Sequence, residues 1–242
     1  SLASDAGLQM PARDPHAQET ADKRTTPNDV VAQAQKLFRT NLRTRAPSEA
    51  HPHLHQPGRD DTAFDRFGIG YAPGGWQALW DHLTGQGVPP ELIFEAGLAK
   101  PSTRGGKPYD VFRDRIMFPI ADVRGRVIAF GGRAMDPNDN AKYLNSPETP
   151  LFDKSRTLYN HALAREAVGK GSALIVAEGY MDVIALVQAG FEGAVAPLGT
   201  AVTDHHLSLL WRMGDEPVIA LDGDKAGLRA AHRVIDLALP MM

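Results

Sequence analysis

Two aspartates separated by a glycine end an apolar run near the end of the chain, in the sequence PVIALDGDKAGLRAA (residues 217–231). Asp222 and Asp224 would repel each other and lose hydration if they approached inside a folded protein without a partner. A cation or a cluster of backbone N–H groups is therefore expected beside them. Asp222 alone could instead serve as the N-cap of a helix that begins in AGLRAA.

A third carboxylate, Glu178, follows another apolar run, ALIVA (residues 173–177). If both runs are parallel strands, their carboxyl ends meet at one edge of a sheet, and Glu178 lies beside the two aspartates. Three carboxylates without a nearby thiol or imidazole favour Mg²⁺ or Mn²⁺ over zinc. Taken alone, Glu178 could form only a salt bridge at that edge. Asp182 is expected in the first turn of the next helix, either at its positive end or hydrogen-bonded around the site, and with Glu178 it is a candidate catalytic residue.

A site made of magnesium and carboxylates chiefly catalyses phosphoryl or nucleotidyl transfer, because the ion withdraws charge from phosphate and lowers the pKa of an attacking hydroxyl. The sequence contains no GxSxG, no HExxH and no cysteine, so acyl transfer and zinc hydrolysis lack support. His51, His53 and His55 could ligate a metal, but they lie in a proline-interrupted stretch where exposure to solvent is the more common state.

The pattern after residue 172 predicts the elements that position these carboxylates. Apolar runs at 173–177, 193–197 and 217–222 are expected to be strands, and each is followed by a helical pattern. Thr203 or Asp204 is expected to cap the second helix, and Pro240 to end the third. Strands that alternate with helices indicate a parallel sheet, and short uninterrupted apolar strands indicate burial on both faces.

The preceding segment has a mixed α+β pattern. A helix capped by Asn28 is expected from Asp29 to about Arg45, and RIMFPIADVRGRVIAFGG predicts a β-hairpin. A short helix is expected over HALAREAV. GKGS (169–172) precedes a strand instead of following one, so it predicts a turn and not a phosphate loop. Residues 1–27 are expected to be a linker, and the fold class as a whole is α/β.

Charge is distributed unevenly around a formal net charge of −3. Residues 101–170 hold 12 Lys and Arg against 8 Asp and Glu, whereas residues 171–242 hold 4 against 9. A basic segment beside an acidic one fits a track for a polyanion next to a cation site, and ordinary surface scatter fits the count equally well. With no long apolar stretch, no signal-peptide pattern and no cysteine, the chain is expected to be soluble and cytoplasmic.

Longer stretches carry a family resemblance. AEGYMDVIAL, GFEGAVAPLGTAVTDHHLSLL and VIALDGDKAGLRAA resemble the Toprim domain of bacterial DnaG-type DNA primases, a module shared with topoisomerases and some nucleases. FRDRIMFPIADVRGRVIAFGGRAMDPNDNAKYLNSPETPLFDKSRTLY and FDRFGIGYAPGGW resemble the primase-specific half of the RNA-polymerase core. The resemblance runs from about Asn28 to the last residue, and it implies a primase-specific subdomain over 28–170 followed by an incomplete Toprim domain over 171–242.

The resemblance implies a DNA-dependent RNA polymerase, a primase that joins ribonucleoside triphosphates into a short RNA primer on single-stranded DNA, with Mg²⁺ or Mn²⁺ as cofactor. It implies that Glu178 is a metal ligand and the acid/base residue, and that Asp222 and Asp224 are metal ligands. It also implies a groove for template and nucleotide that is lined by Arg113, Arg115, Arg133, Lys142 and Lys154.

Three expectations accompany that basic set. Arg113 and Arg115, two residues apart at a strand start, are expected to face one side together. Each of the five residues could instead be only a solvated charge on the surface. Tyr143, beside Lys142, could stack on a base, but burial is the more common state of a tyrosine.

The chain also departs from the family pattern. It ends before the family's second acidic pair, lacks the cysteines of a zinc ribbon and the helicase-binding domain, and does not begin with Met. We therefore expect an excised piece that binds metal more weakly than the complete enzyme and is impaired alone; zinc and the replicative helicase are implied only for the parent protein. A Toprim nuclease or topoisomerase and a non-catalytic single-stranded DNA-binding module are the alternatives.

Overall fold

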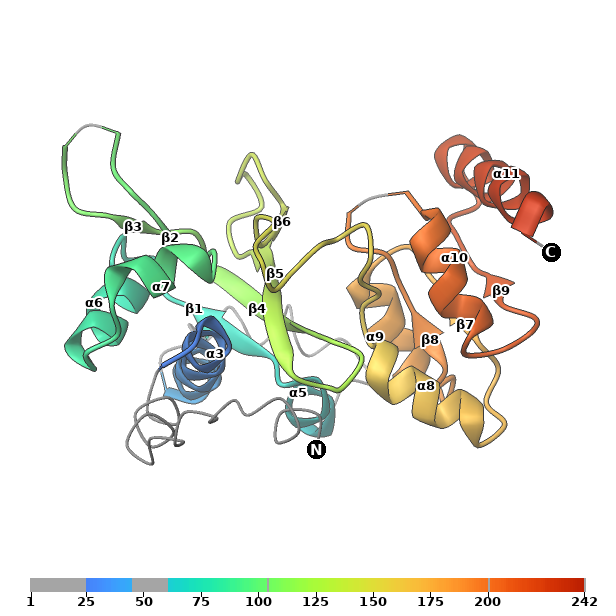
Figure 1. Cartoon of the computed structure of the whole chain (residues 1–242), viewed down its shortest axis with the longest axis horizontal. Coiled ribbons are helices and arrows are strands. Elements are labelled where there is room, and N and C mark those ends of the chain that lie inside the picture. Colours follow the sequence, from blue (N-terminus) through green and yellow to red (C-terminus); the bar gives the residue numbers. More distant parts are fainter. Residues whose placement is uncertain (1–24, 45–60, 104, 200, 242) are drawn as a thin grey trace, which may run out of the picture.

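The structure is a computed structural model that describes residues 25–44, 61–103, 105–199 and 201–241. It contains a central antiparallel sheet with helices on one side and a smaller parallel sheet with its own helices on the other (Figure 1). His51, His53, His55 and nearly all of the predicted linker lie outside the described residues. Within the described ranges, no helix is long and apolar enough to cross a membrane.

The central sheet has four antiparallel strands in the order β1-β4-β5-β6. The predicted hairpin is confirmed, since β4 and β5 pair from Arg115 opposite Ala134 to Ala121 opposite Val127. Gly125 takes a φ of 80° in the turn between them, a conformation that favours glycine. The strands are β1 (Gly70–Ala72), β4 (Arg115–Ala121), β5 (Val127–Ala134) and β6 (Tyr143–Asn145).

Helix α3 (Pro27–Thr44) packs on β1 and β5 through a fully buried apolar face that includes Phe38. Its N-cap is Thr26 and not Asn28 as predicted, because Thr26 Oγ1 accepts from the Asp29 N–H while Asp29 Oδ2 accepts from the Thr26 N–H. The remaining elements of this half are α5 (Asp61–Phe67), α6 (Ala78–Gly85), α7 (Pro90–Glu95) and the paired short strands β2 (Ala99–Lys100) and β3 (Tyr109–Asp110).

The second half is the predicted alternation of strands and helices, which confirms the α/β class. Its three strands are parallel in the order β8-β7-β9, each only two residues long and so shorter than the sequence predicts. GKGS begins at Gly169, the last residue of α8, and continues into the predicted turn, with Gly171 at a φ of 100°. The elements are α8 (His161–Gly169), β7 (Ile175–Val176), α9 (Tyr180–Gln188), β8 (Ala194–Val195), α10 (Asp204–Trp211), β9 (Val218–Ile219), α11 (Lys225–Ala238) and a 3₁₀ turn (Leu239–Met241).

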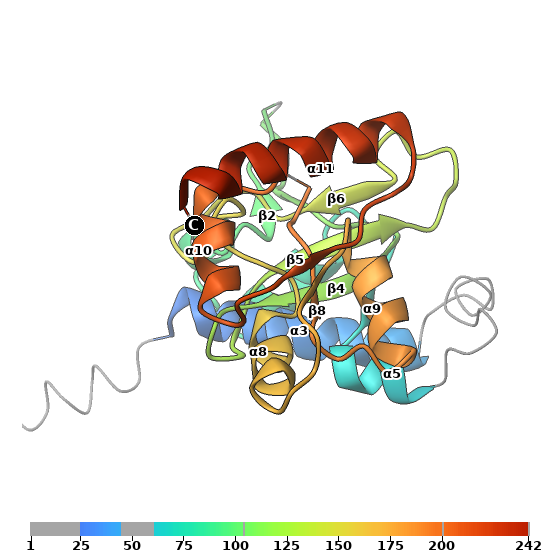
Figure 2. The ribbon, with the colours of Figure 1, turned by 90° about the vertical axis from the view of Figure 1, so that its right-hand side faces the viewer.

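Burial of the parallel strands on both faces holds for β7 and β8 but not for β9. Val218 of β9 is 53% exposed, whereas Ala194 and Val195 of β8, the other edge strand of this sheet, are fully buried. Helix α11 runs across this end of the molecule (Figure 2), with Leu228 and Ile235 exposed on it. The third strand is therefore the least buried support of the carboxylates that follow it.

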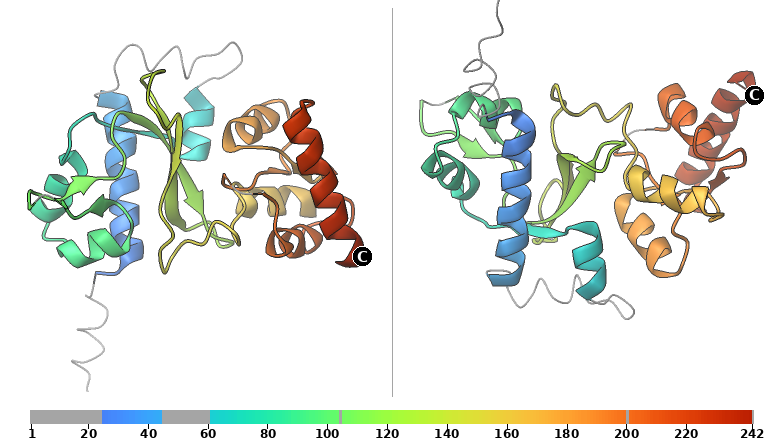
Figure 3. Two further views of the ribbon diagram at one scale, coloured as in Figure 1. Left: turned by 90° about the horizontal axis from the view of Figure 1, so that it is seen from above. Right: turned by 60° about the horizontal axis from the view of Figure 1, so that its bottom comes forward.

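One apolar cluster joins the two halves. Phe118 of β4 packs with Tyr180 and Val183 of α9, and the rings of Phe118 and Tyr180 lie 4.6 Å apart. A Cβ on Gly131 would lie 2.8 Å from Tyr180 Cε1, so this close approach requires glycine. The central sheet consequently stands between α3 on one side and the unit of α8 to α11 on the other (Figure 3).

Candidate functional site

Glu178 and Asp222 lie side by side at the carboxyl edge of the parallel sheet. Strands β7 and β9 pair with Val176 opposite Ile219, so the residues after them leave the sheet at the same edge. The backbone N–H of Asp222 donates to Glu178 Oε2 at 3.4 Å. The structure thus brings together two candidate site residues from different strands, as the predicted topology requires.

Asp224 is the N-cap of α11. Its Oδ1 accepts from the backbone N–H of Ala226 at 2.8 Å and of Gly227 at 2.7 Å. The sequence allowed Asp222 as this cap, but the helix begins at Lys225, which gives the role to Asp224. Asp224 Oδ2 makes no hydrogen bond to a described residue, so this oxygen is available to a cation.

The three carboxylates are exposed and are not gathered around one point. Among the described residues, no group of three or more His, Asp or Glu side chains is close enough to hold a metal ion. The donors nevertheless fit a hard divalent ion, since all of them are carboxylate oxygens. A Cβ on Gly223 would meet nothing within 4 Å, so the chain between the two aspartates has room to adjust.

Asp182 is engaged at the start of α9. Its Oδ2 accepts from the backbone N–H of Gly179 at 3.0 Å, which is the first of its two predicted roles. This contact fixes the turn that immediately follows Glu178. A direct part of Asp182 in catalysis stays a prediction.

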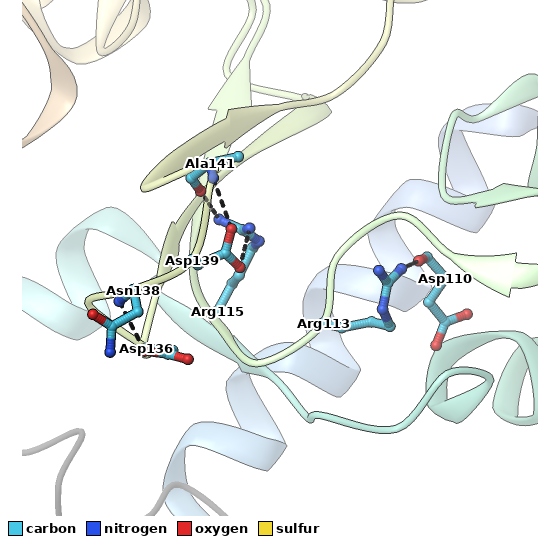
Figure 4. Close-up of polar contacts among 7 residues, drawn as sticks. All are labelled: Asp110, Arg113, Arg115, Asp136, Asn138, Asp139 and Ala141. Carbon is cyan, nitrogen blue, oxygen red and sulfur yellow. Dashed lines mark hydrogen bonds and ion pairs between the residues drawn. The ribbon is translucent and has the colours of Figure 1, made fainter.

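Arg115 is buried, and it holds the loop of residues 136–141 (Figure 4). Its Nη1 donates to the Ala141 carbonyl at 2.6 Å, and its Nη2 pairs with Asp139 Oδ2 at 2.8 Å. The Ala141 N–H and then Arg115 hold the pKa of the Asp139 carboxyl below its ordinary value. Arg115 therefore fastens the loop that leads into Lys142.

Arg113 points away from Arg115 (Figure 4). Its guanidinium donates to the Asp110 carbonyl and lies 4.3 Å from the centre of the Trp76 ring, which is 60% exposed. Asp114, between the two arginines, has a φ of 48°, in the left-handed region. The expectation that Arg113 and Arg115 share one side is wrong, because the alternation of a strand does not continue through that torsion.

Arg133 of β5, Lys142 just before β6 and Tyr143 of β6 form a basic corner, in which Lys142 and Tyr143 are exposed and Arg133 is half-buried. Arg133 pairs with Tyr143 across the strands, and Lys142 Nζ lies 5.8 Å from the Tyr143 ring centre. Tyr143 is 47% exposed, so the expectation of burial is wrong. It lies on β6, one of the two edge strands of its sheet. Neither Arg133 nor Lys142 forms an ion pair with a described residue, which leaves both charges available to a polyanion.

Lys154 lies in the loop between β6 and α8, half-buried and without an ion pair to any described side chain. The backbone of this loop is hydrogen-bonded to Thr203 and His206 at the start of α10. Lys154 therefore follows the last strand of the central sheet in sequence, but hydrogen bonds hold the backbone of its loop to α10 of the parallel-sheet half.

A pocket of about 320 Å³ lies where the two halves meet. Asn145, whose Nδ2 donates to the Leu198 carbonyl at 3.1 Å, and Tyr180 line it but were missed by the sequence reasoning. The only signal for them was their place in the family-like stretches KYLNSPE and AEGYMD. Burial raises the pKa of the Tyr180 hydroxyl, so this group stays protonated. The lining residues are Tyr143, Asn145, Glu178, Gly179, Tyr180, Met181, Asp182, Pro197 and Gly199.

Comparison with known proteins identifies the family. Residues 37–165 match the model of the DNA primase catalytic core, N-terminal domain, and residues 172–241 match the Toprim domain. The chain belongs to the DNA primase catalytic core family. This primase core is 41% identical to a DNA primase of Pseudomonas putida over 98% of the chain, and 44% identical to one of Deinococcus radiodurans over 86%.

Solved structures agree with that assignment. The primase core is similar to the DnaG primase catalytic domain bound to single-stranded DNA, with a TM-score of 0.81, 40% identity and coverage of 92% of this chain and 69% of that one. It is equally similar to a DNA primase domain from Pseudomonas aeruginosa, with a TM-score of 0.81, 40% identity and coverage of 88% and 67%. The chain spans only 36% of the length of each of the two curated relatives from P. putida and D. radiodurans.

Proposed function

We propose that this primase core takes part in the synthesis of short RNA primers from ribonucleoside triphosphates on a single-stranded DNA template. The observation that carries the proposal is the pocket lined by Tyr143 and Asn145 from the basic sheet and by Glu178 from the carboxylate edge. Family membership supports nucleotidyl transfer, and the relative bound to single-stranded DNA supports the template. We assign residues 28–170 and 171–242 to the two units that meet there.

The carboxylate edge would hold the divalent ion. Mg²⁺ on Glu178, Asp222 and Asp224 would neutralise phosphate charge and lower the pKa of the primer 3′-hydroxyl, with pyrophosphate as leaving group. Mn²⁺ accepts the same oxygen donors. The free Oδ2 of Asp224 and the contact between Glu178 and Asp222 support this ligand set. Asp182 holds the turn that carries Glu178, whose second role is acid/base catalysis.

The basic residues divide between binding and support. Arg133, Lys142 and Lys154 attract phosphates of the template and nucleotide, and the exposed Tyr143 ring offers a stacking surface to a base. Arg113 with the exposed Trp76 offers a further cation and ring to a single strand. Arg115 acts indirectly, by fixing the loop before Lys142. The replicative helicase and the zinc ion are proposed only for the complete protein.

Metal-dependent nucleotide binding tests this function. Calorimetric titration of Mn²⁺ and a ribonucleoside triphosphate should show binding to the wild type and none to the double variant Asp222→Asn, Asp224→Asn. Affinity for single-stranded DNA should stay nearly the same, because no basic residue changes. The charge-matched variant Asp215→Asn, Asp236→Asn alters exposed aspartates outside the proposed ligand set and should bind as the wild type does.

Other outcomes would point to other functions. Equal Mn²⁺ affinity in the wild type and the Asp222, Asp224 variant would falsify the ligand assignment. Degradation of nucleic acid with Mn²⁺ and without nucleotides would favour a nuclease. DNA binding without any metal-dependent nucleotide binding would favour a non-catalytic binding module.

A further inference from the structure

His206 is a fully buried histidine of α10, and both of its ring nitrogens have partners. Nδ1 accepts from the backbone N–H of Thr203 at 3.2 Å. Nε2 lies 3.0 Å from the Lys154 carbonyl and 3.1 Å from the Thr157 carbonyl. Since carbonyl oxygens only accept, Nε2 must carry the hydrogen and Nδ1 must be the bare acceptor, which defines one neutral tautomer.

Thr203 forms a second set of hydrogen bonds to the same loop, beside those of the His206 ring. Its Oγ1 donates to the Ser155 carbonyl at 2.6 Å and accepts from the His206 N–H at 3.2 Å. The carbonyls of Lys154, Ser155 and Thr157 are therefore all bound to the start of α10. Asp153 Oδ1 tightens the same turn by accepting from the N–H and the hydroxyl of Ser155.

These contacts fix the backbone of Lys154 while its side chain remains free of ion pairs with described residues. The start of α10 follows the loop whose Pro197 and Gly199 line the pocket beside Glu178. His206 thus connects the loop that bears Lys154 to the loop that borders the carboxylate edge. Lysine has a long flexible stem, and a fixed backbone reduces the freedom that must be given up when its ammonium group binds phosphate.

We propose that His206 is a positioning residue for nucleotide binding, which acts by holding the backbone of Lys154 and so restricting where its ammonium group can meet phosphate. This inference rests on the proposed function, in which Lys154 binds phosphate. His206 is fully buried, and the hydrogen bonds of its ring go only to Thr203, Lys154 and Thr157, so it would act on a nucleotide only through Lys154. Burial lowers the pKa of His206 below its ordinary value, and His205 lowers it further. The contacts with the two carbonyls and the charge of Asp153 raise the pKa but do not outweigh burial. The ring is therefore neutral near pH 7.

Two substitutions separate the two sides of the ring. The amide nitrogen of glutamine can replace Nε2 as donor to the two carbonyls, so His206→Gln keeps the bond to the Lys154 loop. The shorter asparagine can replace only the Nδ1 acceptor, so His206→Asn keeps the bond to Thr203 and releases the loop. Both variants remove the same imidazole from the core, but they keep different hydrogen bonds, so the binding of each is compared at a temperature where thermal unfolding shows both variants to be folded.

The experiment is a titration of the primase core with a fluorescent ATP analogue in the presence of Mn²⁺. Lys154→Ala and His206→Asn should each weaken binding about tenfold, as expected for a charge-assisted hydrogen bond to phosphate. The double variant should bind no more weakly than either single one, because His206 acts through Lys154. His206→Gln should bind within about twofold of the wild type, and it should melt at a higher temperature than His206→Asn, which leaves the two carbonyls without their donor. Both titrations are therefore run well below the lower of the two melting temperatures.

The failures are distinguishable. If Lys154→Ala weakens binding and His206→Asn does not, the positioning role is wrong and the proposed function stands. Equal weakening by His206→Gln and His206→Asn would mean that the histidine only supports the core, which also overturns the inference. If Lys154→Ala binds as the wild type does, the assignment of Lys154 in the proposed function fails and the inference fails with it.

Discussion

The basic residues of the central half and the carboxylates of the parallel-sheet half are held very differently. Arg115 is buried in an ion pair, and the loop of Lys154 is bound through His206. Glu178 and Asp222 are exposed, and a single 3.4 Å contact joins them. Neighbouring carboxylates repel each other when no cation lies between them, so they stay apart until one binds. Basic side chains that contact carbonyl and carboxylate oxygens attract these partners, so they are held in place without a ligand. If the proposed function is right, a polyanion would bind a surface whose supports are already in place, whereas a divalent ion would have to draw Glu178 and Asp222 closer to Asp224.

The largest expected effect is a loss of folding stability when Arg115, one of the basic residues of the central half, is replaced. Arg115→Ala should lower the free energy of unfolding by about 3 kcal/mol, because it removes a buried, packed side chain and the charged donor of the Ala141 carbonyl. Urea denaturation measures this. The control is Arg133→Ala, which removes a half-exposed arginine without an ion pair to the described residues and should cost less than about 0.5 kcal/mol. An Arg115→Ala protein of wild-type stability that has lost DNA binding would make Arg115 a binding residue instead of a fastener.

The next largest effect is expected beside the carboxylates, at Gly227, which allows α11 to approach the backbone of Asp222. A Cβ on Gly227 would lie 2.0 Å from the Asp222 carbonyl oxygen, so Gly227→Ala must displace the helix or the strand end. The expected loss is about 2 kcal/mol of unfolding free energy, together with weaker Mn²⁺ binding in calorimetry.

Gly223→Ala is the matched control, four residues away, because its added methyl group meets nothing within 4 Å. We expect wild-type stability within about 0.5 kcal/mol and near wild-type Mn²⁺ affinity. If Gly227→Ala and Gly223→Ala bind Mn²⁺ equally well, the placement of α11 does not matter to the carboxylate edge.

A pH dependence should come from Asp110, which supports the basic side. Its carboxylate accepts from the N–H groups of Leu79 at 2.7 Å and Trp80 at 2.9 Å, yet burial raises its pKa to about 6. The folded state therefore retains a proton that the unfolded state releases near its ordinary pKa of 3.8. This contribution is complete below pH 4 and disappears as the pH rises to 6.

The expected size is on the order of 2 kcal/mol between pH 4 and pH 7, measured as the difference in unfolding free energy between wild type and Asp110→Asn. Asparagine does not titrate, so the variant should lack this slope. Carboxylates with lowered pKa values, such as Asp139, act mainly below pH 4 and cancel in the difference. Parallel pH profiles for the two proteins would show that Asp110 does not titrate in this range.

The smallest effect sharpens the comparison at the basic corner. Arg133→Ala with Lys142→Ala should weaken binding of single-stranded DNA and reduce the slope of log affinity against log salt by about 0.7 for each phosphate that the variant no longer neutralises. Fluorescence anisotropy at several salt concentrations measures both quantities. Arg124→Ala with Arg165→Ala removes the same charge from other exposed positions and should leave the slope nearer to wild type. Equal slopes in the two double variants would place the track elsewhere.

The elements that follow from local periodicity could be predicted from the sequence. The hairpin and the alternating strands and helices were confirmed, and the parallel topology correctly placed Glu178 beside Asp222. Features set by a single torsion or by what packs over a strand could not be predicted. Asp114 separates the two arginines, and Val218 and Tyr143 are exposed although the edge strands β1 and β8 are buried. The partners of His206 in the Lys154 loop lie about fifty residues away, so no local pattern contains them.

Asp114 also separates two tasks that a regular strand would combine. On an uninterrupted strand, Arg113 and Arg115 would share one environment, and a change in either would disturb the other. Because of the left-handed backbone torsion at Asp114, the two arginines have different neighbours. Arg113 lies over the exposed ring of Trp76, whereas Arg115 is buried against the loop of residues 136–141. A substitution at Arg113 can consequently change the contacts of the exposed surface without disturbing the buried hydrogen bonds by which Arg115 holds its loop.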